Sequence, residues 1–521
     1  MLASAMIVPL LVAVASWRWG RPALSSDTAT GLLAWNSWRA GGPWNCIAEP
    51  SSSNLDNDTF SWVSWWSPGQ YVWLGPFLSL GLSLGCAILA SAIIAAWVKS
   101  IGFYILLRTL GCGAPAAALA TLVEAAGWNL YFSFGTYNGS EVLQAALLPW
   151  LLIGFAIMRN RAAWWIPGIA LFAFAAGFVK HAMFMSALAA TGWLWWESNR
   201  ARNAPWRRWL ASGLLAGAGL VVARLAVARW VVNGGPSPGT LGQTALGSLA
   251  AIGYPFLGPL LSATGAGSVV GRLFFTLHLP SDEGWQRIGW LLALCIPLWL
   301  WFYVRLHALA PVRPVARMTA MFLAVYIAVM LAMLLGGASV SIEDRHFRPA
   351  GMLLIAVAAV ICTESTTLPR RGRMVLVGIL VMVMAFGLAA TAQRIVVLAR
   401  MDRVSPSGIT QSNLSRAAAG EIRRIDIVNG HLGQVFFFSD SCMSLEANRS
   451  RVISTDAMNR PLDWFLRRTW DGRVRRLVLV LPASWEGDPR TRALEACFRG
   501  YTPGEWRPRI VGDCLFISAA D

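Results

Sequence analysis

The sequence predicts an α-helical polytopic membrane protein with a small α/β domain at its C-terminus, and three observations lead to this prediction. The 521 residues are 56% apolar and 13% charged, with a mean hydropathy of +0.53, whereas soluble domains carry about 25% charged residues. Apolar runs long enough to cross a bilayer recur as far as residue 392. Beyond that point the composition becomes that of a soluble domain.

The apolar runs predict eleven membrane spans, or thirteen if one interrupted region crosses twice. Residues 2–17 lack the basic segment and the cleavage site of a signal peptide, so we interpret them as an uncleaved first span. Residues 243–279 are broken by glycine and proline, which fits two short helices, a re-entrant segment or an interfacial stretch. The predicted spans are 2–17, 73–97, 112–133, 142–158, 163–179, 182–196, 209–232, 288–304, 318–336, 349–364 and 374–392.

The charges of the loops predict the orientation. Basic and acidic residues gather in alternate loops, and the cytoplasmic loops of membrane proteins carry the excess of Lys and Arg. We therefore expect a cytoplasmic N-terminus and a C-terminal region outside the cytoplasm. The basic loops contain Lys99 and Arg108; Arg159 and Arg161; Arg200, Arg202, Arg207 and Arg208; Arg305, Arg313 and Arg317; and Arg370, Arg371 and Arg373. The acidic loops contain Asp27, Glu49, Asp56 and Asp58; Glu141; Asp282 and Glu283; and Glu343 and Asp344.

The C-terminal region has the pattern of a small α/β domain. Residues 1–395 are predicted to form the transmembrane domain and residues 396–521 the extracytoplasmic domain. Strands are expected at 435–439, 476–481 and 509–517, and helices at 461–469 and 491–499. Cys497 and Cys514 are the first pair of cysteines to consider for a disulfide, which a compartment outside the cytoplasm permits.

The net charge of +17 would suggest a nucleic-acid partner in a soluble protein. Here the basic residues lie in the loops between spans, so the membrane is the expected partner and nucleic acid is not. Lys99 and Lys180 are the only lysines beside many arginines, a bias typical of a GC-rich bacterial genome. The expected location is therefore a bacterial inner membrane.

Asp27 is the first candidate for chemistry. It lies shortly after the first span, in Ser25-Ser26-Asp27-Thr28. This sequence also suits the start of a helix through residues 32–38, so a capping role is the alternative. An acid close to a bilayer is costly unless it is paired or functional.

The first external loop as a whole resembles that of the GT-C glycosyltransferases, the polyprenyl-phosphate-sugar-dependent enzymes related to protein mannosyltransferases and aminoarabinose transferases. The resemblance rests on Asp27, the small residues and tryptophans that follow it, and Ser67-Pro68-Gly69-Gln70-Tyr71 before the second span. Thr28 stands where many members of that family have Glu. The resemblance implies a GT-C-like transmembrane domain and a catalytic carboxylate at Asp27. Such a carboxylate would take the proton of an acceptor hydroxyl as the new glycosidic bond forms.

The resemblance also directs attention to two residues of later external loops. Glu141 follows Ser140 at the start of a span, where the helix dipole alone favours an acid. In the family an acidic residue of this loop lies beside the first Asp, so Glu141 is a candidate catalytic partner. Lys180 ends the span at 163–179, where a lysine can snorkel or hold the donor phosphate as a point charge.

The loop before the span at 349–364 supplies the remaining candidates for binding the donor phosphate, which are Arg345, His346 and Arg348. The family has Arg-Tyr followed by Pro at this place, and His346 replaces the Tyr. Arginine offers planar donors to a phosphate, and fixed cations stabilise the charge that builds on it. A local ion-pair cluster is the alternative. No metal ligand set stands out, although Asp27 and Glu141 could share a divalent cation, so cofactor use stays open.

The sequence therefore predicts a membrane glycosyltransferase that moves a sugar from a polyprenyl-phosphate carrier to a glycan, lipid or protein acceptor of the cell envelope. A transporter or flippase of lipid-linked saccharides is the first alternative, and it would place charged residues at mid-bilayer within an inverted repeat. A non-enzymatic assembly subunit is the second alternative.

Overall fold

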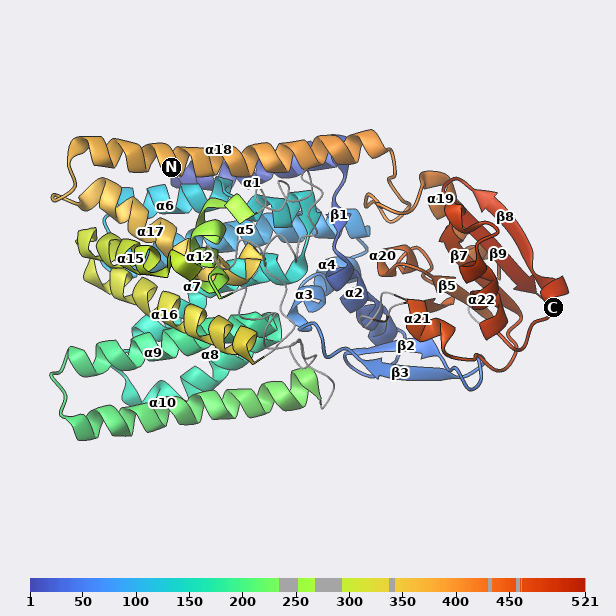
Figure 1. Ribbon diagram of the computed structural model, residues 1–521, viewed down its shortest axis with the longest axis horizontal. Helices are drawn as coiled ribbons and strands as arrows, with labels where there is room; N and C mark the ends of the chain where they lie inside the picture. The colour runs from blue at the N-terminus through green and yellow to red at the C-terminus, as the bar shows by residue number, and fades with distance from the viewer. Residues whose placement is uncertain are drawn as a thin grey trace. The chain divides into compact units, whose positions relative to one another are not determined.

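The computed structural model describes residues 1–233, 252–267, 293–336, 343–429, 433–455, 460 and 462–520. These residues form two compact units. Unit 1 consists of residues 1–12, 93–132 and 140–391, and unit 2 consists of residues 13–92, 133–139 and 392–521. Figure 1 shows the elements of both units.

Most of unit 1 is helical, and eight of the helical segments that the structure describes are long and apolar enough to cross a membrane. The chain is therefore a multi-pass membrane protein. Three shorter helices, α6, α9 and α15, match the other predicted spans, while the number of crossings stays a prediction. The helices are α1 (Leu2–Ala15), α5 (Leu84–Thr109), α6 (Ala114–Ala126), α7 (Gly139–Met158), α8 (Trp165–Val179), α9 (Phe184–Arg200), α10 (Trp206–Val227), α12 (Tyr254–Thr264), α15 (Ile296–Leu309), α16 (Arg313–Leu335), α17 (Arg348–Glu364) and α18 (Arg370–Met401).

Helix α17 is the central helix of unit 1. In the apolar segment that contains it, residues 344–364, 83% of the most apolar stretch is buried, compared with 22% for the segment of α10, residues 206–232. It packs against α6, α12 and α16. Its Gly351 approaches α12 so closely that an added Cβ would lie 2.8 Å from the Ala263 nitrogen. Such contacts through small residues are typical of packing between membrane helices, where backbones must approach for van der Waals contact.

The second predicted span is displaced along the chain. Residues 69–79 form two short helices, α3 (Gly69–Val72) and α4 (Gly75–Ser79), and α5 begins only at Leu84. Gly81, with φ of +82°, separates α4 from α5, in a conformation that favours glycine. Lys99 consequently lies inside α5 and is buried, so its placement in a cytoplasmic loop was wrong. Of the interrupted region at 243–279, the described residues contain α12, whereas Arg272, Asp282 and Glu283 lie outside them.

Unit 2 contains a mixed five-stranded sheet in the order β6-β5-β7-β9-β8. Strands β6, β5 and β7 are parallel, with Phe436 opposite Val452 and Val478, and β9 is antiparallel to β7 and β8. Helix α19 covers one face, while α21 and α22 cover the other. The bounds are β5 (Gln434–Phe438), β6 (Arg451–Ser454), β7 (Arg476–Pro482), β8 (Arg507–Val511), β9 (Cys514–Ala520), α19 (Arg416–Asn429), α20 (Ser441–Ser444), α21 (Leu462–Leu466) and α22 (Pro489–Cys497).

Two expectations for this region were wrong. Residues 509–517 form a hairpin rather than one strand, because the chain turns at Gly512, where φ is +60°. Cys497 packs on the α22 side of the sheet, whereas Cys514 packs on the α19 side. Both thiols are free, and the sheet between them prevents a disulfide. The predicted domain boundary at 395 stays a prediction.

The segment after the first helix also belongs to unit 2. It contains β1 (Ala23–Leu24), α2 (Ser26–Arg39) and the hairpin of β2 (Cys46–Pro50) and β3 (Asp58–Trp62). Strand β1 pairs in parallel with β4 (Thr136–Tyr137). Leu55, between β2 and β3, is fully buried in the core beneath the five-stranded sheet. The C-terminal sheet therefore packs against the loop that follows α2.

Helix α2 packs tightly on α3, which leads to the first prediction. A Cβ on Gly31 would lie 2.5 Å from a ring carbon of Tyr71, so Gly31→Ala should lower stability by about 1–3 kcal/mol through overpacking. Tryptophan fluorescence during thermal unfolding of the purified protein measures this change. Gly378→Ala in α18 is the matched control, because no atom lies within 4 Å of its added Cβ. Equal unfolding temperatures for the two variants would contradict the tight contact between Gly31 and Tyr71.

Candidate functional site

Glu141 is the centre of an ion cluster in unit 1. It lies in the first turn of α7, and its side chain is only 2% exposed. The Lys180 amine, at the end of α8, donates to its carboxylate. The Arg345 guanidinium approaches the same oxygen at 3.9 Å. The structure thus brings together three of the six predicted site residues, which come from three separate parts of the chain at helix ends.

Lys180 and Arg345 are the more accessible members of this cluster. Their side chains are 13% and 23% exposed, whereas that of Glu141 is 2% exposed. The two cations are therefore accessible to a ligand, and the acid is not. Arg345 also pairs with Glu343 at 2.5 Å, and Glu343 is 43% exposed. A phosphate could therefore replace Glu343 at Arg345 without exposing Glu141.

Arg345 is part of η6 (Asp344–Phe347), a short 3-10 turn that precedes α17. Helix α12 supports this turn, since the Tyr254 hydroxyl donates to the Glu343 carbonyl and the Tyr254 ring packs edge-on against Phe347. His346 lies in the same turn, half-buried, and its backbone N–H donates to the Glu343 carbonyl at 3.2 Å. The turn therefore has a defined backbone that directs Arg345 toward Glu141.

Arg348 lies in a second ion cluster rather than beside Lys180. Its guanidinium donates to Glu124 at 2.5 Å and to the Ser262 carbonyl at 2.9 Å. Lys99 donates to the Glu124 carbonyl at 2.7 Å. The three side chains are 9%, 2% and 4% exposed for Arg348, Glu124 and Lys99. Two buried cations thus share one buried acid.

This second cluster was not predicted from the sequence. One signal was present, because Lys99 is one of only two lysines, and each lysine proves to lie beside a glutamate and an arginine. Glu124 is an acid within an otherwise apolar stretch, and such residues are rare in membrane helices without a role. Their pairing involves residues 25 and 224 positions apart, which no local pattern reveals.

Asp27 belongs to unit 2, in the first turn of α2. Ser25, rather than Asp27, caps the helix by accepting from the Thr28 N–H at 3.4 Å. The Gln70 amide donates to the Asp27 carbonyl at 3.3 Å. Ser25 is thus the N-cap residue of α2, and the Asp27 side chain is half-buried.

Thr28 stands where many GT-C enzymes have Glu, and its hydroxyl fixes the loop around Asp27 by hydrogen bonds. Its hydroxyl is fully buried and accepts from the Gly139 N–H at 2.9 Å. It also donates to the side-chain oxygen Oε1 of Gln70 at 3.4 Å. Gly139 is the first residue of α7, the helix that carries Glu141. Thr28 therefore joins the segment after Asp27 to the beginning of that helix.

The residues around Glu141 do not fit a divalent cation. Two cationic groups already contact this carboxylate, and they would repel a metal ion at the same place. Among the residues with described positions, no group of three His, Cys, Asp or Glu side chains is arranged to hold a metal ion.

Comparison with known proteins identifies the fold. No family model and no curated protein sequence matches the chain. Its structure is similar to that of ArnT from Cupriavidus metallidurans bound to undecaprenyl phosphate, with a TM-score of 0.52 and 14% identity over 99% of this chain and 97% of that chain. The arabinofuranosyltransferase AftD from Mycobacteria gives a TM-score of 0.43 at 14% identity, over 99% of this chain and 41% of that chain, which is too low to carry an argument. The chain has the GT-C fold of ArnT, so the fold class and the resemblance predicted from the sequence are confirmed.

The Glu124 cluster generates a prediction about stability. Glu124→Gln keeps the shape of the side chain but leaves Lys99 and Arg348 as two buried cations without an acid. Such a loss costs about 3–5 kcal/mol, so the unfolding temperature of the purified protein should fall sharply. Glu343→Gln, at a partly exposed acid, is the control and should change stability by about 1 kcal/mol or less. An unchanged unfolding temperature for Glu124→Gln would show that the cluster does not stabilise the fold.

The Lys180 amine generates a prediction about pH. Burial lowers the pKa of Lys180 below its ordinary value, Glu141 opposes the shift, and Arg345 adds to it. Lys180 therefore loses its charge as pH rises through this lowered pKa, below the usual lysine value of about 10.4. Activity that needs this charge should fall on the alkaline side. In Lys180→Arg, whose charge persists, the alkaline limb of the pH profile of kcat/KM should move to higher pH. Coincident limbs would contradict a role for the Lys180 charge.

Proposed function

We propose that this chain is a membrane glycosyltransferase that transfers a sugar from a polyprenyl-phosphate carrier to an acceptor of the cell envelope. The observation that carries the proposal is the cluster of Lys180, Glu141 and Arg345, which gathers two cations at the ends of membrane helices in a chain with the GT-C fold. A lipid phosphate is the ligand that such a site suits, because the membrane presents it at this level and fixed cations bind its oxygens.

In the proposed reaction the acceptor oxygen forms a bond to the anomeric carbon while the bond from that carbon to the phosphate oxygen breaks. Asp27 takes the proton of the acceptor hydroxyl as general base. The electron pair of the broken bond stays on the phosphate, which leaves as polyprenyl phosphate. Configuration at the anomeric carbon inverts, and no covalent enzyme intermediate is required.

Lys180 and Arg345 stabilise the charge that develops on the departing phosphate. Glu141 keeps the Lys180 amine in position, because a buried ammonium requires a nearby acid. His346 lies beside Arg345 in η6 and is proposed to contact the same donor. Arg348, whose donors are used by Glu124 and Ser262, is proposed to act on the donor through the position of Arg345.

We further propose a bacterial inner membrane as the location, with the N-terminus in the cytoplasm and the transfer on the opposite side. The alternation of basic and acidic loops supports this orientation. The C-terminal sheet packs around Leu55 of the first long loop, which supports a role in holding that loop. The transferred sugar is a hexose or a pentose, and the mass spectrometry of lipid-linked sugars described below identifies which one.

A flippase remains the second candidate because of one observation. A flippase is expected to have charged residues within its membrane spans, and Lys99, Glu124 and Arg348 are such residues. However, their side chains are at most 9% exposed and they are paired with one another, so they line no path that a saccharide could follow. The observation therefore fits a structural cluster better than a transport pathway.

A deletion strain complemented with variants tests the proposal. Loss of the chain should cause one polyprenyl-phosphate sugar to accumulate and one envelope glycan to lose that sugar, as measured by mass spectrometry of both pools. Asp27→Asn should reproduce the deletion, since a general base contributes about 10²–10⁴-fold to the rate. Asp56→Asn, the same change at an exposed acid of unit 2, should restore the wild-type pools.

The two possible failures have different meanings. If Asp27→Asn restores transfer, Asp27 is not the base, and the transfer depends on other residues. If the deletion leaves every lipid-linked sugar unchanged, the glycosyltransferase proposal itself is wrong.

A further inference from the structure

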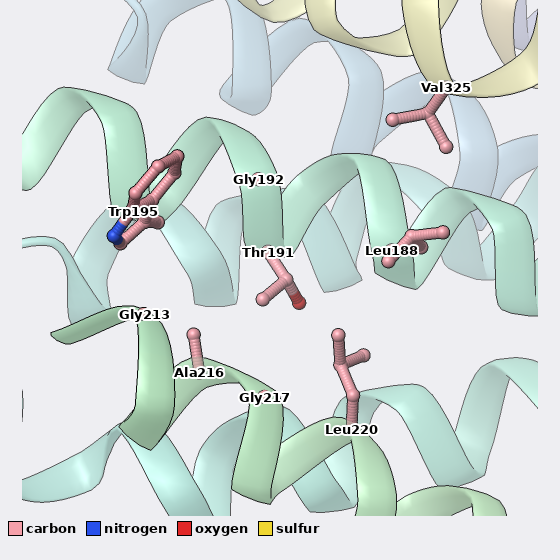
Figure 2. A pocket seen from close by; sticks show the side chains of 9 residues that line it. All are labelled: Leu188, Thr191, Gly192, Trp195, Gly213, Ala216, Gly217, Leu220 and Val325. Atoms are coloured by element: carbon pink, nitrogen blue, oxygen red, sulfur yellow. The ribbon is translucent and has the colours of Figure 1, made fainter. Parts of the chain in front are cut away.

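A groove that the proposed reaction does not use lies between α9, α10 and α16 in unit 1. It has a volume of about 390 Å³, which is within the usual range for ligand sites. Leu188 and Thr191 of α9, Gly213, Gly217 and Leu220 of α10, and Val325 of α16 contribute to its wall (Figure 2). Figure 1 shows α8, α9 and α10 running side by side. Helix α10 also presents exposed leucines such as Leu214 and Leu225, so this part of unit 1 faces the membrane.

Thr191 is the one hydroxyl on this apolar wall, and it is unusual among the threonines of unit 1. It is 3% exposed, and its oxygen has no hydrogen-bond partner among the described residues. Figure 2 shows this oxygen directed into the space between α9 and α10. By contrast, other helical threonines donate to the carbonyl four residues earlier, at 2.7–2.9 Å: Thr121, Thr264, Thr319, Thr363 and Thr391.

A buried hydroxyl without a partner is costly. Because Thr191 points into the groove, the acceptor that satisfies it should belong to whatever occupies the groove. The occupant is therefore apolar along most of its length and carries an acceptor oxygen near Thr191.

Positive charge lies where α9 ends and α10 begins. Arg200, Arg202, Arg207 and Arg208 occupy the hairpin that joins α9 to α10, and all four are exposed. Within the described part of the chain, none of the four forms a salt bridge. Such a basic cluster beside membrane helices attracts anionic lipid head groups.

The tryptophans near the α9–α10 hairpin indicate how deep in the membrane the groove lies. The Trp195 indole N–H donates to the Trp209 carbonyl at 2.9 Å, and Trp206 is 69% exposed. Tryptophans of this kind lie at the level of the lipid head groups. Thr191 precedes Trp195 by four residues on α9 and so lies about 6 Å deeper. This is the level at which a phospholipid carries its ester oxygens, below its phosphate and above its chains.

We propose that the groove binds one acyl chain of an anionic phospholipid, with the phosphate at the arginines of the α9–α10 hairpin and an ester oxygen accepting from Thr191. The lipid comes from the leaflet that this hairpin contacts. It packs between α9 and α10 and fills the groove that the protein leaves open. The site is distinct from Lys180 and Arg345, which lie near the opposite end of α9.

The test uses the full-length protein in detergent and native mass spectrometry after addition of phosphatidylglycerol or phosphatidylcholine. Gly217→Leu places a side chain into the groove, and its Cβ meets no atom within 4 Å, so the fold should tolerate it. It should reduce retained phosphatidylglycerol by about tenfold or more. Gly378→Leu in α18 is the matched control, because its Cβ also meets no atom, and it should retain the lipid.

Two further variants test the polar contacts. The double variant Arg207→Gln with Arg208→Gln should weaken phosphatidylglycerol binding by about 30-fold and leave phosphatidylcholine binding unchanged. Thr191→Val, which has nearly the same shape, should weaken retention of either lipid about fivefold.

Three results would overturn the proposal. Gly217→Leu could retain phosphatidylglycerol as the wild type does. Phosphatidylcholine could bind the wild type as tightly as phosphatidylglycerol. Polyprenyl phosphate could displace the phospholipid at equal concentration from the wild type but not from Gly217→Leu, which would make the groove a site for the donor chain instead.

Discussion

Charge buried among membrane helices must be paired, and this constraint organises unit 1. Desolvating an ammonium or a guanidinium is expensive, and removal of its partner leaves an uncompensated charge. Both lysines of the chain obey this rule in the same way, each beside one glutamate and one arginine. Arg345 lies in η6, and Arg348, three residues later, is the first residue of α17. The contact of Arg348 with Glu124 therefore limits where Arg345 can lie, and the most buried helix of unit 1 supports both.

Unit 2 has a different organisation, in which neutral hydrogen bonds hold the Asp27 loop. Thr28 and Gln70 fix the backbone around Asp27, and β1 pairs with β4 just before α7 begins. Leu55 extends from the same loop into the core of the C-terminal sheet. The position of the proposed base thus depends on hydrophobic packing and on contacts to a helix N-terminus, rather than on a second carboxylate.

The sequence predicted what depends on composition and local pattern. Apolar runs identified the helices, and the resemblance to the GT-C family singled out Glu141, Lys180 and Arg345, which the structure brings into one cluster. The features that the sequence did not predict depend on contacts between residues far apart in the chain, or on the backbone conformation of a single residue. Lys99 was misplaced because hydropathy does not register the break at Gly81, and one strand was predicted where Gly512 makes a hairpin.

The central claim is that Lys180 and Arg345 bind the phosphate of a polyprenyl lipid. The most direct measurement compares the affinities of the purified protein for undecaprenyl phosphate and for undecaprenol, which lacks the phosphate. The account predicts that the wild type prefers the phosphate by about tenfold or more, and that Arg345→Gln loses most of this preference. Equal affinities of the wild type for the two lipids, or an unchanged preference in Arg345→Gln, would contradict it.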